Sequence, residues 1–257
     1  MAILAHEGEI VTWPTQEERS QISRRIREAS GFPSCVGFVD GTLFPFETRP
    51  LMCGQDWYSR RGKYGTAGLL VCDDYTRIHY LYVGWAGCTH DQRVFDNSAL
   101  ELRPDELFSP SQYLLADSGY SPRSHVVPAF KRPPRQGLSA AENAFNSRLS
   151  SIRVRVEHCI GMLKARFSSL RGSRLLIGNE RSLHRCVYWI RACATLHNLL
   201  LDDPVDDEWM GTDDESDDED RREQVEAEYG EVQSTQDEGK RKRRHLMEVV
   251  LAADNGA

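Results

Sequence analysis

The chain has 257 residues, 40% of them hydrophobic, and a formal charge of −7. It contains neither an apolar run of about 18 residues nor a basic start followed by an apolar stretch, which excludes a membrane-spanning helix and a signal peptide. Seven cysteines without a C-x-x-C pair exclude a disulfide scaffold and a zinc ribbon, and they indicate a reducing, intracellular compartment.

Charge is unevenly distributed along the chain. Residues 202–238 carry 18 Asp or Glu against two Arg, a local charge of −16, whereas residues 1–201 carry +6. We expect residues 202–257 to form a disordered acidic tail with a basic run at 240–244 and a short, marginal helix at its end, because so few apolar residues cannot offset chain entropy. The basic part is compatible with a polyanionic substrate.

The N-terminal segment predicts a helix that starts at Thr15, which is spaced to form a capping box with Glu18, and stops at Gly31. Short apolar runs bounded by turn residues then predict five strands, of which the second and third form an antiparallel hairpin. The predicted strands are 35–40, 66–73, 77–84, 113–117 and 125–130.

Helical periodicity dominates the rest of the predicted domain. Apolar residues at every third or fourth position predict a long amphipathic helix at 140–170, and a second helix covers 180–201. Strands followed by helices indicate an α/β or α+β domain at 34–201, preceded by a helical lead-in at 1–33.

Four acidic residues lie in four different short motifs. They are Asp40 in VGFVDGT, Asp91 in GCTHDQRVFDNS, Asp117 in LLADSGY and Glu157 in RVRVEHCIGMLKARF. Carboxylates are the hard oxygen ligands that magnesium accepts. If the four converge, they would suit two ions, which lie about 3.5–4 Å apart in sites that cut phosphodiester bonds.

Each acid also has an ordinary structural interpretation. Asp40 and Asp117 each follow a short strand, where an Asp side chain caps its own turn, and they meet only if their strands are neighbours that end on the same side. Asp91 is placed to cap a short helix. Glu157 borders the apolar stripe of the long helix and fits a solvated charge.

Basic residues near these acids are candidates for nucleic-acid contacts. Two lie beside Asp91, and three lie on the predicted helix that carries Glu157. Either they contact phosphates or they are solvated surface charges. The candidates are His90, Arg93, Arg155, Lys164 and Arg166.

In this order, the four motifs resemble the PIF/Harbinger class of transposases and the Harbinger transposase-derived nucleases, members of the DDE superfamily of endonucleases. The resemblance covers about residues 34–200 and includes R-G-K-Y at 61–64. It implies an α/β fold, an RNase H-like mixed sheet flanked by helices. It also implies that the catalytic and metal-binding acids are Asp40, Asp91, Asp117 and Glu157; in the simplest account Asp40 and Glu157 act with either Asp91 or Asp117.

The resemblance also implies a divalent-metal-dependent DNA endonuclease of transposase type, with Mg²⁺ or Mn²⁺ as cofactor. In a full transposase, the freed 3′-hydroxyl then attacks target DNA. Clustered carboxylates raise one another's pKa, so we expect all four acids to be ionised at neutral pH only with cations bound. The alternative is a transposon-derived protein that acts by binding DNA or protein without cutting.

Only about 33 residues precede the first predicted strand, where the family usually has a helical DNA-binding region. We therefore expect either a separate Myb-like protein that supplies target recognition, or a chain that is a fragment or a decayed element. DNA is the expected partner, a homo-oligomer remains open, and no membrane partner is expected. The basic run at 240–244 predicts localisation in the nucleus.

Overall fold

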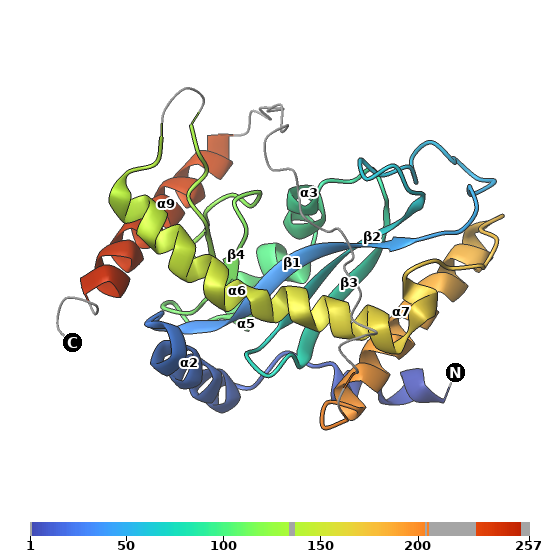
Figure 1. The fold of residues 1–257 in the computed structure, drawn as a ribbon, viewed down its shortest axis with the longest axis horizontal. Coiled ribbons are helices and arrows are strands. Elements are labelled where there is room, and N and C mark those ends of the chain that lie inside the picture. Colours follow the sequence, from blue (N-terminus) through green and yellow to red (C-terminus); the bar gives the residue numbers. More distant parts are fainter. Residues whose placement is uncertain (1, 134–136, 204, 206–229, 253–257) are drawn as a thin grey trace.

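The fold is seen in a computed structural model that describes residues 2–133, 137–203, 205 and 230–252. Five strands form one mixed sheet in the order β3-β2-β1-β4-β5 (Figure 1). The strands are β1 (Cys35–Pro45), β2 (Gly65–Cys72), β3 (Ile78–Ala86), β4 (Tyr113–Ala116) and β5 (Val126–Pro128). A mixed sheet flanked by helices confirms the predicted α/β class.

Helices cover both faces of the sheet. On one face, α2, α6, α7 and α9 contribute side chains to the apolar cluster that also contains Phe38, Leu70 and Leu115. On the other face, α3 and α4 contribute Val94 and Leu100 to a second apolar cluster. The helices are η1 (Ile3–His6), α1 (Glu7–Ile10), α2 (Gln16–Ser30), α3 (Asp91–Asp96), α4 (Ala99–Leu102), α5 (Pro104–Leu107), α6 (Ala140–Arg166), η2 (Ser168–Leu170), α7 (Glu180–Leu199) and α9 (Gly230–Ala252). None of these helices is long and apolar enough to cross a bilayer.

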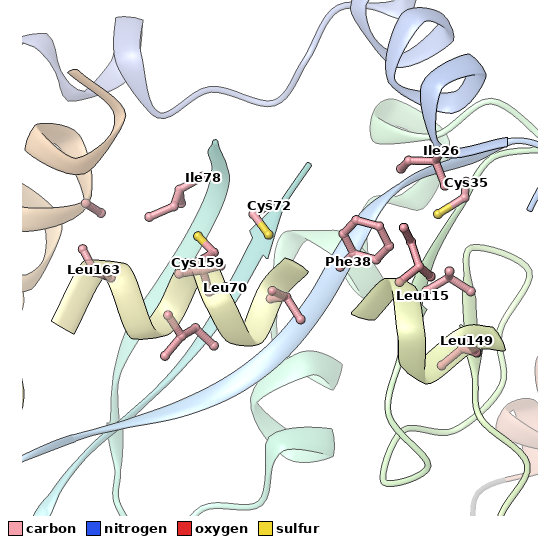
Figure 2. Packing of buried hydrophobic residues seen from close by; sticks show 14 of the residues in the cluster. Ile26, Cys35, Phe38, Leu70, Cys72, Ile78, Leu115, Leu149, Cys159 and Leu163 are labelled. Carbon is pink, nitrogen blue, oxygen red and sulfur yellow. The ribbon is translucent and has the colours of Figure 1, made fainter. Parts of the chain in front are cut away.

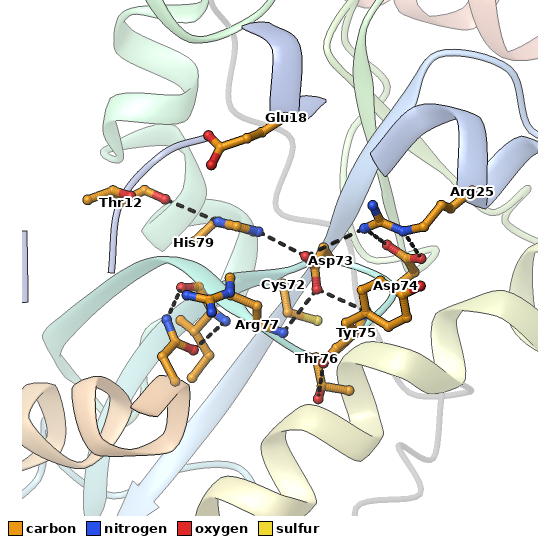
Figure 3. A network of polar contacts seen from close by, with 12 residues as sticks. Thr12, Glu18, Arg25, Cys72, Asp73, Asp74, Tyr75, Thr76, Arg77 and His79 are labelled. Atoms are coloured by element: carbon orange, nitrogen blue, oxygen red, sulfur yellow. Dashed lines mark hydrogen bonds and ion pairs between the residues drawn. The ribbon is translucent and has the colours of Figure 1, made fainter. Parts of the chain in front are cut away.

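The predicted hairpin is present as the antiparallel pair β2–β3. Its turn is fixed by Asp73, whose Oδ1 accepts hydrogen bonds from the backbone N–H groups of Tyr75 at 2.9 Å and Arg77 at 3.0 Å. Arg25 of α2 donates two bonds to Asp74, at 2.6 and 2.7 Å, and thereby ties this turn to the preceding helix (Figure 3). The capping box of Thr15 and Glu18 that starts α2 is also present.

The long helix α6 runs across the sheet and supplies much of the core (Figure 1). Figure 2 shows Cys159 and Leu163 beside Leu70, Cys72 and Ile78 of the β2–β3 hairpin. α6 ends at Arg166, and the last part of the predicted 140–170 helix is instead the 3₁₀ turn η2. This packing fixes the position of every α6 side chain relative to β1.

Within the tail that we expected to be disordered, residues 230–252 form a helix, longer than the short one expected there. Residues 204 and 206–229, which carry most of the acidic charge, lie outside the described residues. Residues 230–252 form α9, which packs beside the start of α6 (Figure 1). Leu246 and Val250, one turn apart, are 5% and 0% exposed, and this burial offsets the chain entropy of the segment.

Truncation of Leu246 tests whether α9 belongs to the folded domain. We expect Leu246→Ala to lower the free energy of unfolding by about 2–5 kcal/mol, because it removes a buried side chain and leaves a cavity. The matched control is Val249→Ala on the same helix, where the side chain is 38% exposed and the change stays within about 0.5 kcal/mol. Urea unfolding of the two variants measures the difference; equal stabilities would show that α9 is not docked in solution.

Candidate active site

Asp40 lies within a continuous strand, not at the strand end that the sequence suggests. β1 continues through Asp40 and Gly41 to Pro45, and each of these residues pairs with β2, Asp40 opposite Leu70. The D-G dipeptide is therefore not a turn. The N–H of Gly41 donates to Asp40 Oδ1 at 2.9 Å, so the carboxylate is still held by its own backbone.

Asp117 lies beside Asp40 because β1 and β4 are parallel neighbours. Phe38 pairs with Leu115, and Asp40 and Asp117 each lie two residues farther along. β4 stops at Ala116, and Asp117 is 8% exposed at its end. Its Oδ1 accepts the N–H of Gly119 at 2.9 Å, so the turn-capping role also holds. The two acids are therefore neighbours, although β1 continues beyond Asp40 while β4 stops before Asp117.

Asp91 reaches the same region from the other face of the sheet. It is the first residue of α3, and the N-cap position belongs to His90. A side chain at Gly41 would come within 2.2 Å of the Asp91 carboxylate, so only glycine allows this approach. Because successive strand residues point to opposite faces, Asp91 and the Asp40 side chain lie on opposite sides of β1.

Arg153 of α6 forms an ion pair with Asp40. Its Nη2 lies 3.1 Å from Asp40 Oδ2, and the two side chains are only 11% and 18% exposed. The arginine is therefore a counter-charge built into the group of acids. Sequence reasoning missed it, although its position four residues before Glu157 places both on one side of the helix.

Glu157 is exposed on α6, one helical turn beyond Arg153, the ion-pair partner of Asp40. Across the part of the chain that the structure describes, no three His, Cys, Asp or Glu side chains are arranged to hold one metal ion. Asp91 and Asp117 act electrostatically on Asp40, and the membership of Glu157 in the same site stays a prediction.

The pKa values of Asp40 and Tyr120 reflect the proximity of these aspartates. Burial raises the pKa of the Asp40 carboxyl to about 8; Arg153 opposes this shift, and Asp117 and Asp91 add to it. Tyr120, three residues after Asp117, has its pKa raised well above the ordinary value by burial and then by the same three aspartates. Its buried hydroxyl makes no hydrogen bond to another described residue. At Asp40 the neighbouring acids thus add to a rise in pKa that burial chiefly causes.

A cleft of about 150 Å³ opens next to the acids. Asp91 and Asp117 line it, together with residues from the end of β1, from the 59–61 segment and from the approach to α3. Asp40 and Glu157 are not among its lining residues. Asp117 is therefore the acid that lies beside Asp40 and also borders the cleft.

Basic side chains border the cleft as well. Arg60 and Arg61 line it, and the Arg60 guanidinium contacts the ring of His90. Sequence reasoning singled out His90 but not these arginines; the signal was the R-G-K-Y motif, which begins at Arg61. The spacing of that motif did not indicate that it would lie at the cleft beside Asp91 and Asp117.

The other predicted nucleic-acid contacts divide into two groups. Arg93 and Arg155 are exposed, as a phosphate contact requires. Lys164 is 3% exposed. Arg166 is half-buried and donates to the backbone carbonyls of His197 and Asp203. As folded here, Lys164 and Arg166 stabilise the domain and are not presented to a ligand.

Comparison with known proteins places these motifs in a family. A profile of the DDE superfamily endonucleases matches residues 39–198, more than half of the chain and a span that includes all four acids. The chain belongs to this family. Among curated proteins, "Putative nuclease HARBI1" of Mus musculus is 25% identical over 206 residues, which are 80% of this chain and 57% of that relative. No solved structure gives a significant match.

The chemistry of the described residues fits the divalent cation that the DDE family implies. The donor set consists of carboxylate oxygens, and the buried, unpartnered hydroxyl of Tyr120 lies close to them. Asp91 and Asp117, which both line the cleft, are the described residues that would meet a cation there, and Asp40 lies beside Asp117. Joint ligation would require Asp40 to share its carboxylate between Arg153 and the cation, since Oδ2 is paired with the arginine here.

Removal of the Arg153 charge tests the ion pair. Above pH 8, where Asp40 is ionised, we expect Arg153→Met to lower the free energy of unfolding by about 3–5 kcal/mol, because it leaves the buried carboxylate without its counter-charge. The double variant Arg153→Met/Asp40→Asn should recover part of this loss. Thermal and urea unfolding give the values; a single variant as stable as the wild type would contradict the assignment.

The raised pKa of Asp40 predicts how stability depends on pH. Between the unfolded-state pKa of about 4 and the folded-state value of about 8, the folded protein retains a proton that the unfolded chain loses. The metal-free protein should therefore lose stability as pH rises through this window, by at most about 1.4 kcal/mol per pH unit. Asp40→Asn should flatten this part of the curve. Urea unfolding at pH 5 and pH 8 checks it, and parallel curves for the two proteins would contradict it.

Proposed function

We propose that this chain is a divalent-metal-dependent DNA endonuclease of transposase type that hydrolyses phosphodiester bonds. The observation that carries the proposal is the position of Asp117, which lies beside Asp40 across the parallel β1–β4 pair and lines the cleft with Asp91. Membership of the DDE endonuclease family supplies the reaction class. The name of the mouse relative, which includes the word nuclease, points in the same direction.

The residues of the chain divide the work of the proposed reaction. Asp40 and Asp117, with Asp91 from the opposite face, would hold Mg²⁺ or Mn²⁺, and Glu157 would join them from α6 as the family resemblance implies. Arg60 and Arg61 at the cleft would orient the phosphodiester. A bound divalent cation supplies acidity to water and neutralises charge that develops at phosphorus. Between Asp91 and Asp117 as third acid, Asp117 is favoured because it is the strand-end neighbour of Asp40.

A second candidate function is DNA or protein binding without cleavage. One observation favours it: Arg153 already forms an ion pair with Asp40, and among the described residues no three acids are arranged to hold one cation. A chain of this kind would keep the fold and the basic cleft border but would hold no catalytic cation. The nuclease is preferred because Asp40, Asp91 and Asp117 are together and lie next to a cleft.

Partners and location are further proposals. We propose DNA as substrate, a Myb-like protein or a second copy of the chain as partner in target recognition, and action in the nucleus. The basic run at 240–244 supports the last point, although Lys242 and Arg243 donate to backbone carbonyls within the domain. A fluorescent fusion should therefore be altered at Lys240, Arg241 and Arg244, which are exposed. An unchanged nuclear signal would reject the basic run as the localisation signal. Sedimentation of the protein with and without DNA measures whether copies of the chain assemble.

Nicking of supercoiled plasmid by the full chain tests the nuclease. The full chain is needed because α9 contributes to the core. We expect nicking with Mg²⁺ or Mn²⁺, its loss with EDTA, and at least a ~100-fold lower rate for Asp117→Asn, since the cation contributes several kcal/mol to the transition state.

The matched control is Asp105→Asn, the same substitution at an exposed residue of α5, which should nick like the wild type. Circular dichroism and thermal unfolding establish that each variant is folded. Nicking that survives in Asp117→Asn would reject the assigned site. A folded wild-type protein that binds DNA and does not nick it would favour the binding-only function.

A further inference from the structure

One surface element beside the cleft carries both of the arginines, Arg60 and Arg61, that line it. It is the sequence Tyr58 to Tyr64, YSRRGKY, which we name the cationic turn. Three of its seven residues are cations, Arg60, Arg61 and Lys63, and all three are exposed. The turn ends immediately before β2 and lies at the cleft that Asp91 and Asp117 border.

The cationic turn is closed by its own hydrogen bonds. Tyr58 and Tyr64 form an antiparallel bridge, and their rings lie 5.0 Å apart. The carbonyl of Lys63 accepts both the N–H of Ser59 at 2.9 Å and the Ser59 hydroxyl at 2.8 Å. Gly62 has a φ of 72°, a left-handed conformation that suits glycine. The backbone is thus fixed before any ligand binds.

The core holds the base of the cationic turn in place. Trp57, the residue before the turn, is 7% exposed and belongs to the main apolar cluster. Its carbonyl accepts the N–H of Gly65, the residue after the turn, at 2.9 Å. Movement of the turn relative to Asp117 would therefore disturb both the core and the start of β2. A rigid loop that carries several cations loses little entropy when it binds an anion.

We propose that the cationic turn is a phosphate-binding element that holds the backbone of a DNA strand alongside the cleft. The inference rests on the proposed function insofar as DNA is the substrate, but it does not require that the chain cuts DNA. One arginine guanidinium can donate two hydrogen bonds to the oxygens of one phosphate. Contacts with phosphates supply most of the affinity of proteins for nucleic acid. Arg60 and Arg61 line the cleft itself, so the phosphates they bind are those that flank the bond near Asp117.

DNA binding by the full chain, without divalent metal, tests the proposal. Fluorescence anisotropy with a labelled 30-base-pair duplex is measured in EDTA over a series of NaCl concentrations. We expect Arg60→Gln/Arg61→Gln to weaken binding at least about 10-fold. The slope of log K against log salt should fall by up to about 1.8, since each lost phosphate contact contributes about 0.9 for duplex DNA.

The matched control is Arg181→Gln/Arg185→Gln, which removes the same charge from two exposed arginines of α7. It should keep the wild-type slope and nearly the wild-type affinity. Wild-type binding by the turn variant would overturn the proposal. An equal loss in the control would also overturn it, because net charge alone would then explain the effect, and so would a wild-type protein that binds no duplex.

The outcome is separable from that of the nicking experiment. A chain that binds through the cationic turn and never nicks supports the inference and rejects the nuclease. A turn variant that nicks and binds like the wild type, when Asp117→Asn does not nick, supports the nuclease and rejects the inference.

Discussion

The parallel pairing of β1 with β4 is the constraint on which the site depends. These two strands are far apart in the sequence, and their register, Phe38 opposite Leu115, decides that Asp40 and Asp117 are neighbours. A shift by one residue would turn one of the two carboxylates to the other face. The pairing is protected on both faces, because α6 packs over one side of the sheet and α3 over the other. The chemistry of the site is thus fixed by a buried backbone ladder.

The second organising feature is the balance of charge around Asp40. Asp40 lies where burial disfavours ionisation, and Arg153 is paired directly with it. Burial and the neighbouring acids favour the protonated form of Asp40, whereas Arg153 favours the ionised form. A cation that enters the cleft would meet Asp91 and Asp117 first, because Asp40 faces α6.

Much of this fold could be predicted from local patterns. The capping box of α2, the β2–β3 hairpin and the helical periodicity of α6 depend on residues close in sequence, and all three are present. The site was harder to predict. The continuation of β1 through Gly41 depends on pairing with β2, and the position of Asp91 depends on a close approach to a glycine 50 residues away. Neither signal is visible to local propensity, and the docking of α9 depends on partners 100 residues earlier.

The position of α9 has a consequence for self-association. β5 is the last strand of the sheet on its side, and an unpaired outer strand readily pairs with the strand of another molecule. α9 lies along this border, where Arg243 donates to the carbonyls of Pro128 and Ala129 and Lys242 donates to that of Ser124. The basic run thereby occupies the carbonyl of Pro128, the last residue of β5, and two carbonyls that flank the strand. α9 thus covers part of the border at which an exposed strand would favour intermolecular β-pairing.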